Sequence, residues 1–225
     1  MHQVVLKPFL RTLAAALAAC LICLAPAAIA QEPWFEQDSL NAGMAAPPAT
    51  LDRATPMAAM ETFLYLAEHD HFSVAAHLLD LSDVALADQQ TIGTERARML
   101  SVILERKVVI PWSSLEDRPD GWLSGNSEDN DTGRERRSIL IDRMERGGHL
   151  VPLRLNRIKA ADTKEPVWVF SRQSVDNIPA LYALYGPTDL ELALPEWLRT
   201  PAFWGMFLWE VLFLPLVALA ALIVA

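Results

Sequence analysis

The sequence predicts an α+β domain in which helices pack on a small antiparallel sheet, flanked by an N-terminal signal peptide and a C-terminal transmembrane helix. Apolar residues recur at helical spacing over 55–107, β-branched runs dominate 138–170, and both ends of the 225-residue chain are long apolar stretches. The chain therefore divides into a signal peptide (1–30), a flexible leader (31–53), a folded domain (54–200) and a membrane helix (201–225).

The first thirty residues follow the order of a secretory signal peptide. Lys7 precedes an apolar run from Leu13 to Ile29, and Ala28 and Ala30 supply the small residues that signal peptidase reads. Cleavage is predicted after Ala30. Two alternatives stay open, an uncleaved signal anchor and lipoprotein processing at Cys20.

The last segment is predicted to cross a membrane. Residues 202–225 contain one charged side chain, Glu210, and as a helix they would extend about 36 Å. Trp197, Trp204 and Trp209 crowd the first part, where indole rings suit the headgroup level. No Lys or Arg follows the apolar run, so we expect the sequence to continue beyond Ala225.

The folded domain begins with helical patterns. Thr55 and Pro56 form an N-cap followed by proline at the first helical position, and the helix they open carries apolar residues at helical spacing. Further helices are predicted near Phe72–Leu79 and over Asp88–Lys107. A closing helix runs from about 172 to the Gly186-Pro187 stop, bent or divided at Pro179.

Strands are predicted between these helices. The β-branched run Val108–Ile110 is followed by an acidic, Gly- and Ser-rich loop over 117–133. The remaining predicted strands are Ser138–Met144, Leu150–Ile158 and Val167–Phe170, with Gly147-Gly148 closing the hairpin between the first two. Together they predict a small antiparallel sheet.

Charge and cysteine content exclude several classes. The net charge is −9 and no Lys/Arg cluster occurs, which excludes a nucleic-acid partner because affinity for phosphate comes from clustered cations. Both cysteines, Cys20 and Cys23, lie in the signal peptide, so the mature protein would have no thiolate ligand or disulfide.

No catalytic, cofactor or metal site is predicted. His69, His71 and His77 with Asp70 invite a metal interpretation, but their spacing does not converge, and solvated or capping histidines between two helices are expected instead. The acidic stretch Glu128, Asp129 and Asp131 lacks the alternation of an EF-hand loop. No nucleophile elbow, phosphate loop or zinc motif occurs, so we expect neither an enzyme nor a cofactor.

Three stretches, taken in order, resemble one family. They are Thr55-Pro56 with its helix and Leu79-Asp80-Leu81-Ser82, then Val167–Ser171 running on to Ile178–Tyr182, then Leu194-Pro195-Glu196-Trp197-Leu198 before the apolar segment. In this order they resemble the N-terminal periplasmic region of MscS-type (small-conductance) mechanosensitive ion channels, truncated in its first transmembrane helix. The resemblance spans Thr55 to Ala225.

The resemblance implies a periplasmic domain in the bacterial inner membrane that modulates or assembles a tension-gated channel whose pore is not in this chain. Its implied partners are membrane lipid and either further copies of itself or channel subunits. The alternative is a membrane-anchored binding module, since helices on a curved sheet are also similar to NTF2-like domains, which often enclose a small-molecule pocket.

Overall fold

The computed structural model describes residues 32–122, 134–161 and 163–198, together with 208, 209, 211–213 and 215. The predicted signal peptide, most of the predicted acidic loop and most of the predicted membrane helix therefore lie outside the described residues. Within the part that is described, no helix is both long and apolar enough to cross a membrane.

The helices between residues 56 and 185 occupy regions that periodicity predicts, whereas the short helix at Asp189–Ala193 does not. They are α2 (Pro56–Glu68), α3 (Phe72–Ala75), α4 (Gln89–Lys107), α5 (Arg172–Tyr185) and α6 (Asp189–Ala193), with short 3-10 turns at Ala76–Leu78, Leu86–Asp88, Trp112–Ser114 and Glu196–Leu198. The predicted cap of α2 is confirmed, because the Thr55 hydroxyl accepts from the Ala58 amide at 3.0 Å. Gly186 ends α5 as predicted, but Pro179 does not divide that helix.

The sheet is mixed rather than antiparallel, which corrects the prediction. Its strands are β1 (Phe35–Gln37), β2 (Ser138–Arg146), β3 (His149–Ala160) and β4 (Val167–Phe170). β2 and β4 pair antiparallel with β3, whereas β1 pairs parallel with it. The parallel strand comes from the segment predicted to be a flexible leader, where Leu40 and Asn41 are also buried.

β3 is the central strand, and its pairing partners define both edges. Asn156 lies opposite Ser138 of β2 and Val169 of β4, so these two strands occupy opposite edges. Ile158 pairs with Val167 of β4 on one side and with Phe35 of β1 on the other. β1 therefore lies on the same side of β3 as β2, next to residues of β3 that β2 does not reach. The hairpin predicted at Gly147-Gly148 is confirmed, with φ of 57° and 80° at the two glycines.

The predicted strand Val108–Ile110 is not a strand. Val108 caps α4 with extended backbone, and the side chain of Val109 is 86% exposed. A β-branched run forms a strand only where a neighbour supplies hydrogen bonds and a surface to pack against, and this one continues directly into Pro111 instead.

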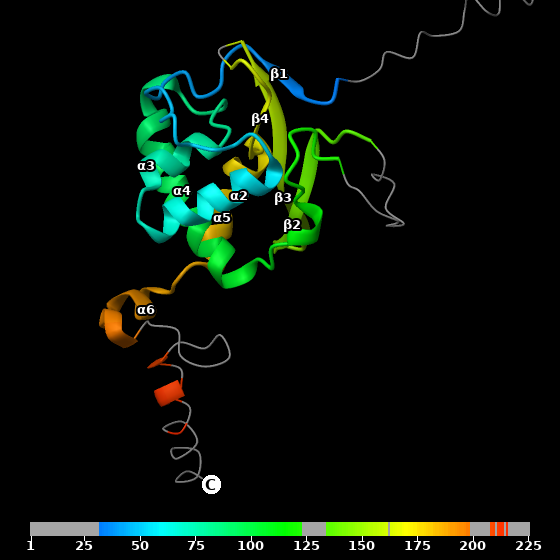
Figure 1. The fold of residues 1–225 in the computed structure, drawn as a ribbon. Helices are drawn as coiled ribbons and strands as arrows, with labels where there is room; N and C mark the ends of the chain where they lie inside the picture. The colour runs from blue at the N-terminus through cyan, green and yellow to red at the C-terminus, as the bar shows by residue number, and fades with distance from the viewer. Residues whose placement is uncertain are drawn as a thin grey trace, which may run out of the picture. The chain divides into compact units, whose positions relative to one another are not determined.

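The main core lies between one face of the sheet and the helices, which gather on one side of the strands in Figure 1. Phe63 of α2 meets Phe170 of β4 edge to face, with ring centroids 5.0 Å apart. Leu153 and Leu155 of β3 also enter this core. A smaller apolar cluster of Leu40, Ile158, Ala160 and Val169 lies on the opposite face, beneath the segment that follows β1.

Candidate functional site

The face of the sheet that points away from the main core carries a polar depression. Because successive strand residues alternate between faces and Leu155 is in the main core, Arg154 and Asn156 lie on the other face. A cavity of about 420 Å³ opens there. We call it the sheet-face basin; its polar lining includes Gln37, Asp80, Ser138, Arg154, Asn156 and Arg172.

Arg154 is the cation at the floor of this basin. Its Nη1 donates to the hydroxyl of Ser138 at 3.2 Å, a neutral partner on the neighbouring strand. No carboxylate lies within ion-pair distance of Arg154 among the described residues. Arg172 differs, because its Nε lies 3.2 Å from Asp83 and its charge is thereby offset. Arg154 is therefore the lining cation without an ion pair in this part of the chain, and the carboxylate-bearing residues Glu36 and Asp80 line the same basin.

The first turn of α5 forms the wall beside Arg154. The Ser171 amide donates to the Arg154 carbonyl at 2.9 Å, and the Ser174 hydroxyl accepts from the Arg154 amide at the same distance. The Ser171 side chain caps the helix by accepting from the Ser174 amide at 3.2 Å. The amides of Arg172 and Gln173, which precede Ser174, have no intrahelical acceptor. Both residues line the basin, so the positive end of the helix dipole lies beside it.

The opposite wall holds a carboxylate that already has partners. Asp80 is 3% exposed, and its Oδ2 accepts from Gln37 Nε2 at 2.9 Å while its Oδ1 accepts from the Ser82 amide at 3.1 Å. The Asp80 amide donates to the Phe170 carbonyl at 3.0 Å, which fixes this segment beside β4. Both carboxylate oxygens are therefore occupied, and Asp80 serves as a wall and not as a free acceptor.

Two amide side chains in the basin have unmet hydrogen-bonding capacity. Gln37 Oε1 and Asn156 Oδ1 are both buried without a hydrogen-bond partner among the described residues. Unsatisfied buried oxygens are uncommon in folded proteins and tend to mark places where the protein maintains polarity for a reason other than stability. Both atoms are acceptors, so a donor from solvent or from a ligand would satisfy them.

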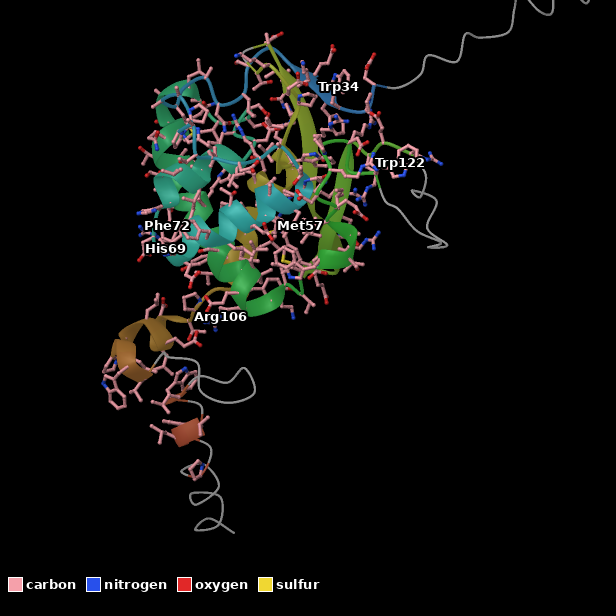
Figure 2. All side chains as sticks on the ribbon, in the orientation of Figure 1. Trp34, Met57, His69, Phe72, Arg106 and Trp122 are labelled. Carbon is pink, nitrogen blue, oxygen red and sulfur yellow. The ribbon has the colours of Figure 1, made fainter. Side chains whose placement is uncertain are left out.

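A second feature joins the core to the segment that precedes the apolar tail. Arg106, in the last turn of α4, places Nη2 2.9 Å from Glu191 Oε1 of α6. Figure 2 labels Arg106 on the side of the domain next to α6. We call this pair the α4–α6 junction. The side chain of Glu191 is 7% exposed, so water competes little for its ion pair with Arg106.

Glu191 is also part of a capping box. Its Oε2 accepts from the Thr188 amide at 2.6 Å, while the Thr188 hydroxyl accepts from the Glu191 amide. Burial raises the pKa of Glu191, but the hydrogen bonds from Thr188 and the hydrogen bond and charge of Arg106 outweigh it, so the pKa lies below the ordinary value. The ionised carboxylate is the form that holds the junction together.

The histidines of the sequence are separated by structure. His69 caps the C-terminus of α2 and His71 precedes α3, with their rings stacked at 6.3 Å, which confirms the predicted position between two helices. His77 differs from the prediction because it is buried, and desolvation followed by the charge of Arg53 lowers its pKa. Over the described ranges, no group of three or more His, Cys, Asp or Glu side chains is placed to hold a metal ion.

The acidic stretch Glu128, Asp129 and Asp131 lies outside the described residues.

No protein-family model matches the chain, and no curated protein or solved structure matches it either. The candidate sites therefore rest on geometry, and sequence reasoning had identified neither of them. Period-two alternation along 152–158 was the one available signal for the basin, because it places Arg154 and Asn156 on a shared face.

Proposed function

We propose that this chain is the extracytoplasmic domain and first membrane helix of an MscS-type mechanosensitive channel family protein. In this role it modulates or assembles a tension-gated channel whose pore lies outside the chain, with the domain in the periplasm and the apolar tail in the inner membrane. Membrane lipid and further copies or channel subunits are its proposed partners, and the role involves no catalytic step and no cofactor.

The α4–α6 junction carries this proposal. Tension can shift a channel only if a membrane helix is coupled to the rest of the protein, and coupling requires contacts that differ between states. The ion pair between Arg106 and Glu191 ties the long core helix α4 to the segment that leads into the apolar tail. A force on that tail would therefore reach the domain core through a short and partly buried contact.

The surface near the junction supports a membrane-facing orientation. The side chains of Leu190, Leu192 and Trp197 are all exposed. Exposed leucines and an exposed indole just ahead of an apolar segment suit the interfacial zone of a bilayer. In this arrangement α6 lies at the headgroup level.

Two of the stretches that resemble the channel family also meet in space. Leu79 forms a parallel bridge with Phe170, so the Leu79–Ser82 stretch extends the sheet beside β4. The stretches are about ninety positions apart in sequence. Their pairing gives a structural reason for both to occur in one chain, which favours treating them as one motif.

Topology is the first test. A reporter enzyme fused after Thr200 should be active outside the cytoplasm. In a separate experiment, the full chain without a reporter should remain with membranes after a carbonate wash. Reporter activity inside the cytoplasm, or recovery of the chain in the water-soluble fraction, would refute the proposal.

The second test addresses coupling. The gene, with its natural downstream reading frame, is expressed in cells that lack other tension-gated channels, and patches are recorded under suction. We expect Arg106→Gln to shift the tension threshold. Arg96 lies on the same helix as Arg106, and Arg96→Gln, which removes its 3.1 Å ion pair with Asp176 of α5, should not shift it. Absence of tension-gated current from the wild-type gene would reject the channel role. Equal thresholds in the wild type and both variants would reject coupling through the α4–α6 junction.

A second candidate function is a membrane-anchored NTF2-like binding module, and the sheet-face basin favours it. The helix-facing side of the sheet is filled by apolar side chains such as Leu153, Leu155 and Trp168. The basin on the opposite face is the small-molecule site that this candidate would use. A wild-type chain that binds a ligand there but gives no tension-gated current would support this candidate.

A further inference from the structure

The basin combines donors at one end with an apolar surface at the other. Arg154, the Ser138 hydroxyl and the first-turn amides of α5 gather around one end of the floor. All three kinds of group donate hydrogen bonds, and two of them carry positive charge or partial charge. An oxyanion is the ligand group that satisfies them together.

The other end of the floor is apolar. Phe35 of β1 and Ile158 of β3 are direct partners in the parallel pairing, so their side chains lie on the same face, and both line the basin. Ile158 is 1% exposed, so the half-buried Phe35 supplies the apolar surface that a ligand can reach. Four residues separate Arg154 from Ile158, a span of about 13 Å along the strand. A ligand that uses both ends must therefore carry its anionic group and its apolar group a few bonds apart.

The charges nearby limit the ligand to one negative charge. Glu36 and Asp80 line the basin and Asp83 forms an ion pair with Arg172, so a dianion would meet repulsion from these carboxylates. Arg154 is the lining cation that has no ion pair among the described residues. A singly charged carboxylate fits this balance better than a phosphate group does.

We propose that the sheet-face basin binds a small monocarboxylate that carries a short apolar or aromatic group. The carboxylate accepts from Arg154 and from the first-turn amides of α5, and the apolar group packs on Phe35. The cavity of about 420 Å³ lies within the range usual for small-molecule sites. This assignment does not depend on the channel proposal, and it supplies the ligand class that the second candidate function lacks.

The test is calorimetric titration of the full chain, purified with detergent, with 3-phenylpropionate as the probe and detergent blanks subtracted. We expect a Kd of roughly 1 mM or tighter. The neutral 3-phenylpropionamide has the same shape without the charge, and it should bind at least about tenfold more weakly because charged hydrogen bonds are lost. Inorganic phosphate should bind more weakly than 3-phenylpropionate.

Two variants locate the site. Arg154→Gln should weaken 3-phenylpropionate binding about tenfold or more, whereas Arg143→Gln, an exposed arginine on β2 outside the basin lining, should leave it unchanged. Circular dichroism confirms that each variant folds. If Arg154→Gln does not fold, the comparison of acid and amide on the wild-type chain decides the matter by itself.

Several results would overturn the assignment. Equal binding of the acid and the amide would show that the negative charge of the ligand is not recognised. Tighter binding of phosphate than of 3-phenylpropionate would show that the apolar group of the ligand does not contribute to affinity. An unchanged Kd in a folded Arg154→Gln variant would place any binding elsewhere. Each of these outcomes leaves the topology and tension measurements unaffected, so failure of the ligand assignment and failure of the channel proposal are distinguishable.

Discussion

Thr55 and Asp117 are joined by a hydrogen bond although 62 positions separate them in sequence. Thr55 Oγ1 donates to Asp117 Oδ1 at 2.9 Å, while the same oxygen accepts from the Ala58 amide at 3.0 Å. One hydroxyl therefore caps α2 and also fixes the loop that follows α4. Thr55 is buried, so water cannot easily replace either bond.

Replacement of Thr55 should be costly for this reason. We predict that Thr55→Ala lowers the free energy of unfolding by about 1–3 kcal/mol, the sum of a lost N-cap and a lost buried hydrogen bond. Thr55→Ser keeps the hydroxyl and should lose much less. Urea denaturation followed by circular dichroism measures both. If the serine variant were as unstable as the alanine variant, the packing of the Thr55 methyl group would be responsible instead.

Gly121 and Gly147 form a matched pair for a second prediction. Both have left-handed backbone, with φ of 59° and 57°, but a Cβ on Gly121 would lie 2.8 Å from Cζ2 of the fully buried Trp168, whereas Gly147 has nothing within 4 Å. Gly147→Ala should cost about 1–2 kcal/mol from backbone strain alone. Gly121→Ala should cost about 1–3 kcal/mol more, because it also overpacks the core.

Tryptophan fluorescence offers an independent readout of this difference. Trp168 Nε1 donates to the Pro119 carbonyl at 3.0 Å, close to Gly121 in sequence. A shifted ring would change this bond, so the emission of the folded protein should change in Gly121→Ala and not in Gly147→Ala. Equal stability losses in the two variants would show that the loop around Gly121 moves away from the indole without cost.

Local signals predicted well wherever the physical cause was local. The cap at Thr55, the stop at Gly186 and the hairpin at Gly147-Gly148 each depend on a few adjacent residues, and each is present. Helical periodicity similarly placed α2, α4 and α5. The confirmed elements are those for which the chain needs no distant partner to decide its conformation.

The predictions were wrong where contact with a distant segment determines whether a stretch forms a strand. Phe35–Gln37 is a strand because the edge of β3 at Ile158–Ala160 is open to it, and nothing in its own Pro- and polar-rich surroundings indicates this. Val108–Ile110 has high β propensity but no such edge. The basin depends on the same long-range pairing, since Gln37 and Asp80 reach it from segments that are far apart in sequence.

His77 leads to a prediction about pH. Burial and the charge of Arg53 lower its pKa below the ordinary 6.5, so the folded state favours the neutral ring. Because the folded pKa is the lower one, the stability linked to His77 is fully present above pH 6.5 and is lost as the pH falls through the folded pKa.

We therefore expect the free energy of unfolding to decrease as the pH is lowered below about 6.5, and His77→Gln to flatten this dependence. His149→Gln serves as the control, because His149 is exposed. Unfolding midpoints measured across this pH range test the prediction. An unchanged slope in His77→Gln would mean that other groups account for the loss of stability.

Glu191 has the corresponding acidic dependence at the α4–α6 junction. Its folded pKa is below the ordinary value of 4.5, so its contribution is present above pH 4.5 and is lost as the pH falls through the folded pKa. Protonation removes the partner of Arg106 and weakens the capping box with Thr188 together. As the pH is lowered, the contact between α4 and α6 should therefore be lost before the main core unfolds.

Carbon-13 NMR of the Glu191 carboxyl group measures its titration directly. We predict a titration midpoint below 4.5 in the wild type and a higher midpoint in Arg106→Gln, because the cation favours the ionised form. Arg96→Gln removes a different ion pair of α4 and should leave the midpoint in place. If Arg106→Gln left the midpoint unchanged, the Thr188 hydrogen bonds alone would hold the carboxylate, and α4 would not be the element to which α6 is coupled.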